Sequence, residues 1–152
     1  MKTPTLESLA EEQLALRLAR FDYDFVWELG QELRQAAAEQ GLPVAVQIRH
    51  GEDVVFSTLL PGATSDNFDW ARRKCAVAHR FQKSSLAVRL EAEAKGYDLN
   101  AAFRLPPADF VASGGGIPLI LTSGAMIGTA AVSGLPDLED HALVVSALAS
   151  LI

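Results

Sequence analysis

Residues 113–136 read SGGGIPLILTSGAMIGTAAVSGLP, and this stretch predicts a β-hairpin. Ile117 to Thr122 and Met126 to Ser133 are apolar runs rich in small and β-branched residues, and Ser123-Gly124 has the composition of a two-residue turn. Runs that are apolar at consecutive positions are typical of strands buried on both faces in the centre of a sheet. We therefore expect the rest of the chain to pack around this hairpin.

The first third of the chain predicts a helix, a strand and a second helix. Thr5 can cap the first helix. From Leu14 to Ala19, every second residue is a leucine, which is the period of a half-buried strand. The same sequence also fits a longer helix. Asp22 or Asp24 then supplies the N-cap of a strongly amphipathic helix that ends at Gly41.

The middle of the chain predicts a second hairpin followed by two helices. Val44 to Arg49 and Val54 to Leu59 have the composition of paired strands, joined by the turn-forming residues 50–53. The first helix is expected from about Asn67 to Phe81, and the second lies between Ser85 and Gly96.

The remaining segments complete the predicted fold. Tyr97 to Pro107 is expected to be irregular, Asp109 to Ala112 to add a short edge strand, and Asp137 to cap a last helix. Hairpins predominate over β-α-β units, so the predicted class is α+β: a mainly antiparallel, five-stranded sheet with packed helices.

Composition limits the kind of protein this is. The chain has 152 residues, of which 49% are hydrophobic, enough for one core, so we expect a single domain over residues 1–152. A net charge of −6 argues against a nucleic-acid partner, which would require a basic face. No apolar run approaches the ~20 residues of a membrane span, and the single Cys75 excludes an internal disulfide. These features predict a cytoplasmic protein without a membrane partner.

Several short motifs together resemble a known superfamily. They are Asn67-Phe68-Asp69-Trp70-Ala71-Arg72-Arg73-Lys74, Arg80-Phe81, Ser84-Ser85, Gly114-Gly115-Gly116-Ile117-Pro118, Val132-Ser133-Gly134-Leu135-Pro136 and Asp140-His141. This combination resembles the haem-degrading-domain superfamily, in particular the uncharacterised bacterial and fungal subfamily related to HbpS and GlcG. The resemblance implies a profilin-like α+β fold with a central antiparallel sheet, assembly into homo-oligomers, and haem as the cofactor to consider.

The basic run Arg72-Arg73-Lys74 beside Trp70 is the first candidate ligand-binding feature. Arginine offers a forked donor to a carboxylate or phosphate, and Arg73 should lie nearest to Trp70 on the helix. The alternative is a solvated helix face or a subunit contact.

The glycines Gly114, Gly115 and Gly116 form the second candidate. They lack the spacing of a nucleotide-binding loop and precede a strand, so they predict a tight backbone passage whose amide groups can face an anion or a carbonyl. Asp140-His141 opens the last helix, where His141 can serve as an acid, a base or a ligand. We expect a small-molecule site, if the chain has one, where these glycines, this helix start and the Arg73-Lys74 helix meet.

Other residues suggest chemistry only weakly. Cys75 and His79 are four residues apart on one helix, which gives two metal ligands where a structural zinc site needs about four, so no metal site is predicted. Ser84 and Ser85 lack the setting of a nucleophilic serine and fit a helix cap.

Two functions from different classes follow from the sequence. The first is a homo-oligomeric protein that binds a small anionic ligand or acts as a scaffold. The second is a protein that binds or degrades haem, or an enzyme acting on a small anionic substrate. His50, His79 and His141 are candidate axial ligands by residue type alone.

Overall fold

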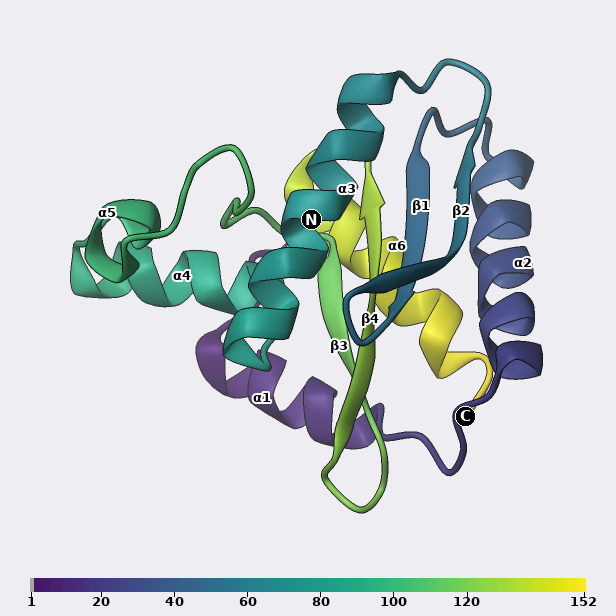
Figure 1. Cartoon of the computed structure of the whole chain (residues 1–152), viewed down its shortest axis with the longest axis horizontal. Helices are drawn as coiled ribbons and strands as arrows, with labels where there is room; N and C mark the ends of the chain where they lie inside the picture. The colour runs from purple at the N-terminus through teal and green to yellow at the C-terminus, as the bar shows by residue number, and fades with distance from the viewer. Residues whose placement is uncertain (1) are drawn as a thin grey trace.

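The computed structural model describes residues 2–152, which form one antiparallel sheet with helices on both faces (Figure 1). The elements follow in the order α1 (Leu6–Ala15), α2 (Tyr23–Glu39), β1 (Ala45–His50), β2 (Asp53–Leu59), α3 (Ser65–Phe81), α4 (Ser85–Lys95), α5 (Leu99–Phe103), β3 (Gly116–Ile120), β4 (Met126–Ser133) and α6 (Asp137–Ala149). The predicted α+β class is confirmed, with four strands in this range where five were expected. None of these helices is long and apolar enough to cross a membrane.

Both predicted hairpins are present, and they pair with each other. The strand order is β2-β1-β4-β3, and every neighbouring pair is antiparallel. The central pair is β1 with β4, in a regular register from Ala45 opposite Ser133 to His50 opposite Gly128. The hairpin of residues 113–136 therefore contributes one central strand, β4, and one edge strand, β3.

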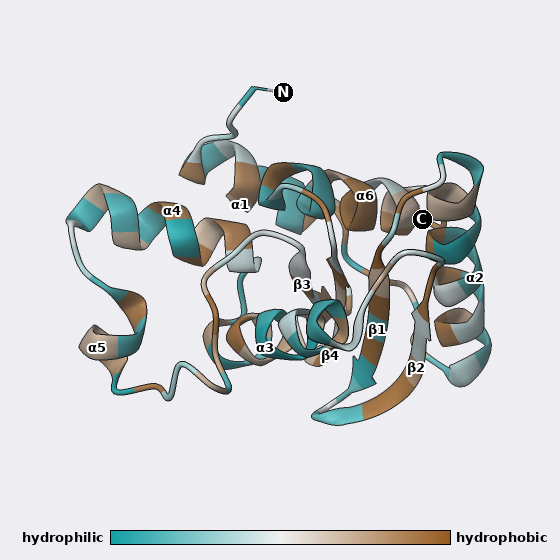
Figure 2. Cartoon of the chain, turned by 90° about the horizontal axis from the view of Figure 1, so that it is seen from above, coloured by the Kyte–Doolittle hydropathy of each residue, from teal (hydrophilic) through white to brown (hydrophobic). Residues whose placement is uncertain are grey.

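The two faces of the sheet are covered by different helices (Figure 2). Val46, Ile48 and Val132 belong to the main hydrophobic core beneath α2 and α6. The alternate residues point to the other face, where Ala45 and Ala131 pack against α3. Helix α3 covers β1, β3 and β4, whereas α2 packs beside β1 and β2.

The strand predicted over Leu14 to Ala19 is wrong. Helix α1 continues to Ala15, and the chain needs the following residues to reach the N-cap of α2 at Asp22. Leu18 alone pairs with the sheet, in a parallel bridge to Leu121. Its amide donates to the carbonyl oxygen of Ile120 at 2.8 Å, so the expected fifth strand is reduced to one residue.

Three further expectations differ from the structure. Asp109 to Ala112 does not form a strand, because the amides of Asp109 and Phe110 donate to the carbonyl of Pro106 in a turn, and Asn100 donates to the carbonyl of Phe110. Residues 97–107 contain the short helix α5, which Asp98 caps. Pro136 is the N-cap of α6, and Asp137 uses its carboxylate elsewhere.

Candidate functional site

A hollow of about 290 Å³ lies where α3 faces the end of β4 and the start of α6. Its lining includes Asn67, Trp70, Lys74, Ser113, Gly134 and Asp140. These residues come from three separate parts of the chain. The β3–β4 pairing and the packing of α3 across these two strands bring these parts together.

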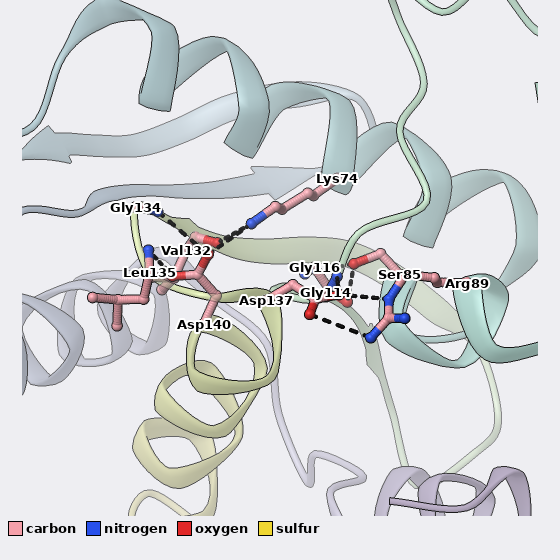
Figure 3. A network of polar contacts seen from close by, with 10 residues as sticks. All are labelled: Lys74, Ser85, Arg89, Gly114, Gly116, Val132, Gly134, Leu135, Asp137 and Asp140. Carbon is pink, nitrogen blue, oxygen red and sulfur yellow. Dashed lines mark hydrogen bonds and ion pairs between the residues drawn. The ribbon is translucent and has the colours of Figure 1, made fainter. Parts of the chain in front are cut away.

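A buried ion pair forms the floor of this hollow (Figure 3). Lys74 Nζ lies 2.9 Å from Asp140 Oδ2 and donates also to the carbonyl of Val132 at 3.1 Å. The two side chains are 2% and 1% exposed. Asp140 accepts two more hydrogen bonds, from the amides of Gly134 and Leu135. The carboxylate thus holds the residues after β4, while the ammonium holds α3 to β4.

Burial works against both charges of this pair. It lowers the pKa of Lys74 and raises the pKa of Asp140, because water no longer solvates either ion. The attraction between the two groups opposes both shifts, and the amides that donate to Asp140 oppose the rise of its pKa. The pair therefore depends on mutual compensation, and removal of either member leaves an unbalanced group in the interior.

The glycines form the close backbone passage that the sequence predicts. Gly115 has φ of +130°, and a Cβ atom there would overlap the carbonyl oxygen of Val132 and lie 2.9 Å from Lys74 Nζ. A Cβ atom on Gly116 would lie 2.6 Å from the carbonyl oxygen of Lys74. Only glycine lets this strand entrance lie directly against the ion pair.

Protein side chains bind the amides of two of these glycines. Gly114 donates to Asp137 Oδ2 at 2.9 Å, and Gly116 donates to Ser85 Oγ at 2.9 Å (Figure 3). Arg89 Nε donates to the same Asp137 carboxylate at 2.6 Å. The structure thus gives these two amides to protein groups and not to an external anion.

Sequence reasoning missed the roles of Ser85, Arg89 and Asp137. Arg89 and Asp137 are 48 positions apart in the sequence. Members of a local motif lie much closer together, so the sequence gives no signal for this pairing. Ser84 is the N-cap of α4 as expected, whereas the neighbouring Ser85 points to Gly116. The Ser-Ser pair therefore has two distinct structural roles.

The basic run divides between the surface and the interior. Lys74 faces the sheet, whereas the Arg73 guanidinium lies 4.5 Å from the centroid of the Trp70 ring and bonds to Asp69 at 3.0 Å. Arg72 also binds Asp69, and this hydrogen bond is the main reason why the pKa of that carboxyl is lowered. Trp70 therefore lines the hollow with Arg73 packed on its ring, and the candidate anion-binding run is divided because Lys74 points inward.

His141 lies apart from the hollow. Its Nε2 atom is 2.7 Å from Glu12 Oε1 on α1, and the residue is 4% exposed. Successive side chains on a helix diverge by about 100°, so the adjacent Asp140 points in another direction, to Lys74. The structure therefore gathers Trp70, Lys74 and Asp140 with the glycines and leaves His141 out.

Cys75 is a buried residue with a protonated thiol. Burial raises its pKa to about 11, which disfavours the thiolate required of a nucleophile or a metal ligand. Within residues 2–152, no group of three or more histidine, cysteine, aspartate or glutamate side chains is arranged to hold a metal ion.

Comparison with known proteins gives consistent matches over nearly the whole chain. The family model described as "Haem degrading protein HbpS-like" matches residues 21–149. A UPF0303 protein of Streptomyces avermitilis is 42% identical over 147 residues, which cover 97% of this chain and 90% of that protein. The crystal structure of the Ybr137w protein has a TM-score of 0.89 at 28% identity and covers 99% of this chain and 88% of that one. A PduOC:heme complex has a TM-score of 0.74 at 19% identity, covering 86% and 94%, and so shares the fold.

Proposed function

The chain belongs to the HbpS-like haem-degrading family, and from this membership and the hollow above Lys74 we propose that it is a homo-oligomeric protein that binds a small ligand. The observation that carries the proposal is the hollow itself. Polar groups from three segments meet there over a fixed, buried ion pair. Concave sites with a few fixed polar groups are the usual form of small-molecule sites.

The chemistry of the floor favours a ligand with an anionic acceptor. A lysine ammonium has three N–H donors, and Lys74 uses two of them on Asp140 and Val132. The third can donate to a carboxylate, while Asn67 and Ser113 offer further polar contacts from the lining. Because Asp140 balances the lysine charge, we expect modest affinity for such a ligand.

The proposed site residues largely follow the sequence prediction. The proposed site takes in Trp70, Lys74 and Asp140 from the lining of the hollow, the passage Gly114–Gly116 beside the ion pair, and Arg73, which packs on the Trp70 ring. We leave His141 out of the proposal because Glu12 occupies its Nε2 atom.

The two tryptophans of the chain permit a direct test. Trp70 lines the hollow, whereas Trp27 lies on α2 and packs against Phe56. In the Trp27→Phe variant, Trp70 is the single fluorophore and should show a saturable change when small mono- and dicarboxylates are added. The matched Trp70→Phe variant should show none. An identical response of both variants, or no saturable response of Trp70 to any compound, would contradict the proposed site.

Self-association is supported by the surface around β2. This strand is one edge of the sheet and leaves Val54 and Leu59 50% and 44% exposed. On the neighbouring α2, Tyr23 and Trp27 are 62% and 58% exposed. Open strand edges and clustered exposed apolar residues are common features of surfaces that pair with another chain.

Haem binding is the second candidate function, and His50 is the histidine that favours it. Its Nδ1 atom lies 3.0 Å from the Tyr23 hydroxyl, and its ring packs 5.3 Å from that of Phe21. A metal-bound histidine commonly donates its second N–H to a neighbouring polar group, which here would leave Nε2 for iron. When bound, haem would supply the iron chemistry, while Tyr23 would orient the histidine and Phe21 would contact the macrocycle.

A hemin titration distinguishes the candidate ligands. We expect weak binding without protein-dependent biliverdin formation, because haem turnover needs a controlled distal pocket and an electron supply, and the sequence has no flavin or nicotinamide fingerprint. His50→Ala should remove the Soret shift, and His141→Ala should retain it. A tight one-to-one complex that persists in His50→Ala would exclude this residue as the ligand.

A further inference from the structure

Unpaired polar groups gather beneath α3, outside the hollow. Five of the buried side-chain atoms that lack a hydrogen-bond partner among residues 2–152 belong to four residues of this layer: Gln47 (Nε2 and Oε1), Arg49 (Nε), Thr129 (Oγ1) and His79 (Nδ1). Gln47 and Thr129 are fully buried, and Arg49 is 6% exposed. Native proteins rarely bury polar atoms without a partner, so a group of them indicates a missing ligand.

The sheet register places these groups side by side. Gln47 and Arg49 are two residues apart on β1 and point to the same face. Thr129 lies directly opposite Arg49 on β4, where facing Cβ atoms are about 4.5–5.5 Å apart. From α3, Cys75 is close enough for Thr129 and Arg49 to influence its pKa, and His79 follows one turn later.

Arg49 is the decisive member of this group. Among the described residues, no carboxylate lies within ion-pair distance of its guanidinium, and its buried Nε atom has no hydrogen-bond acceptor. By contrast, Lys74, which is also a buried cation on this face of the sheet, has an acidic partner. An arginine cannot discharge by losing its proton, so its burial requires a negative charge nearby.

We propose that Arg49, Gln47 and Thr129 bind a small monovalent anion, of the size of chloride or formate, between α3 and the β1–β4 pair. Arg49 Nε, Gln47 Nε2 and Thr129 Oγ1 are its three hydrogen-bond donors. A small anion suits this place because Gln47 and Thr129 are fully buried and Arg49 is nearly so, which favours a small ligand over a larger one. A water molecule would satisfy hydrogen bonds but not the arginine charge.

This site is separate from the hollow above Lys74. Thr129 precedes Ser133 by four residues on β4, which corresponds to about 13 Å along the strand. The proposal therefore does not depend on the ligand proposed for the hollow, and Trp70 fluorescence does not report on it.

Bromide gives the most direct test, because it replaces chloride and scatters anomalously. Crystals of the wild-type protein soaked in sodium bromide should show an anomalous peak among Arg49 Nε, Gln47 Nε2 and Thr129 Oγ1. In solution, the melting temperature should rise saturably with sodium chloride or sodium formate at constant ionic strength. Thr129→Val, which keeps the side-chain shape but removes one donor, should weaken this response about tenfold.

Arg49→Met should abolish the response, and Arg34→Met on the exposed surface of α2 should leave it unchanged. General salt effects act on all variants alike, so the comparison isolates the site. The proposal is overturned if bromide gives no peak at this position, or if Thr129→Val and wild type respond equally to the anions. It is overturned also if the crystal shows a carboxylate of a second copy bound to Arg49.

Discussion

Replacement of Lys74 by methionine tests the buried ion pair that forms the floor of the hollow. Methionine retains most of the apolar stem and removes the ammonium, so Asp140 loses its charged partner while remaining buried. Breaking such a pair by removing one member typically costs about 3–5 kcal/mol. Both side chains are almost fully buried, at 2% and 1% exposure, so solvent screening does not reduce this free-energy cost. The amides of Gly134 and Leu135 still donate to Asp140, and we expect a loss of about 3 kcal/mol in the free energy of unfolding.

The pH dependence of this loss has a definite sign. Burial raises the pKa of Asp140 above its ordinary value of 3.8, and Lys74 counteracts that rise. In Lys74→Met the counteraction is gone, so the folded-state pKa of Asp140 rises further. A raised pKa contributes stability that is present below the unfolded-state value and is lost as pH rises through the folded-state value. The difference between wild type and Lys74→Met should therefore be smaller near pH 5 than near pH 8.

Urea denaturation at the two pH values measures both quantities. Lys83→Met is the matched control, because Lys83 is 52% exposed and its ion pair with Glu91 contributes little. Equal melting of Lys74→Met and Lys83→Met would refute the reasoning, as would a loss of stability that does not change with pH. The first result would mean that Asp140 is not left buried without a partner, and the second that its pKa does not rise into this pH range.

Two further predictions concern the glycine passage and assembly. Gly115→Val should lower stability by at least about 2–3 kcal/mol because the new side chain would overlap the Val132 carbonyl at a positive φ. Ser113→Ala should change stability by less than about 0.5 kcal/mol, and equal melting temperatures of these two variants would show that Gly115 is an ordinary loop residue. Light scattering coupled to size exclusion should give a mass that is a multiple of 16.3 kDa, and a monomer at micromolar concentration would contradict the proposed oligomer.

The elements with strong local signals could be predicted from the sequence. The strands of the hairpin of residues 113–136 are found where its apolar runs place them, and so is the helix that Asp22 caps. The predicted two-residue turn at Ser123-Gly124 is wrong, because the Leu121 amide donates to the Ala125 carbonyl and leaves residues 122–124 in the loop. The alternation over Leu14 to Ala19 misled because leucines recurring every second residue also fit the end of a helix followed by a single bridging residue. The edge strand expected at Asp109 to Ala112 is wrong because a turn at Pro106 uses the amides of Asp109 and Phe110, and the Asn100 side chain binds the carbonyl of Phe110.

The candidate site could be predicted only as a meeting of segments. Residue types and helix position suggested Trp70 and Lys74, and glycine content suggested the passage. The inward direction of Lys74 had no such signal, since a lysine between an arginine and a cysteine is usually part of a solvated face. Its burial depends on Asp140, which lies 66 residues later and reaches Lys74 through tertiary packing. The sequence likewise gives no sign that the Arg49 side chain lacks a partner, because this depends on residues that only the fold places around it.

The contacts that build this site also hold the fold together, and this overlap determines which variants can reveal function. Lys74, Asp140 and Gly115 join α3, β4 and the start of α6, so replacing any of them changes binding and folding at once. Two other lining residues, Ser113 and Trp70, are less subject to this ambiguity, because no hydrogen bond anchors the Ser113 side chain among residues 2–152 and Trp70 is half-buried. A ligand that binds in the hollow should therefore lose affinity in Trp70→Phe or Ser113→Ala without a change in melting temperature. Loss of binding only in variants that also melt earlier would identify the ion pair as a structural feature and not as part of a binding site.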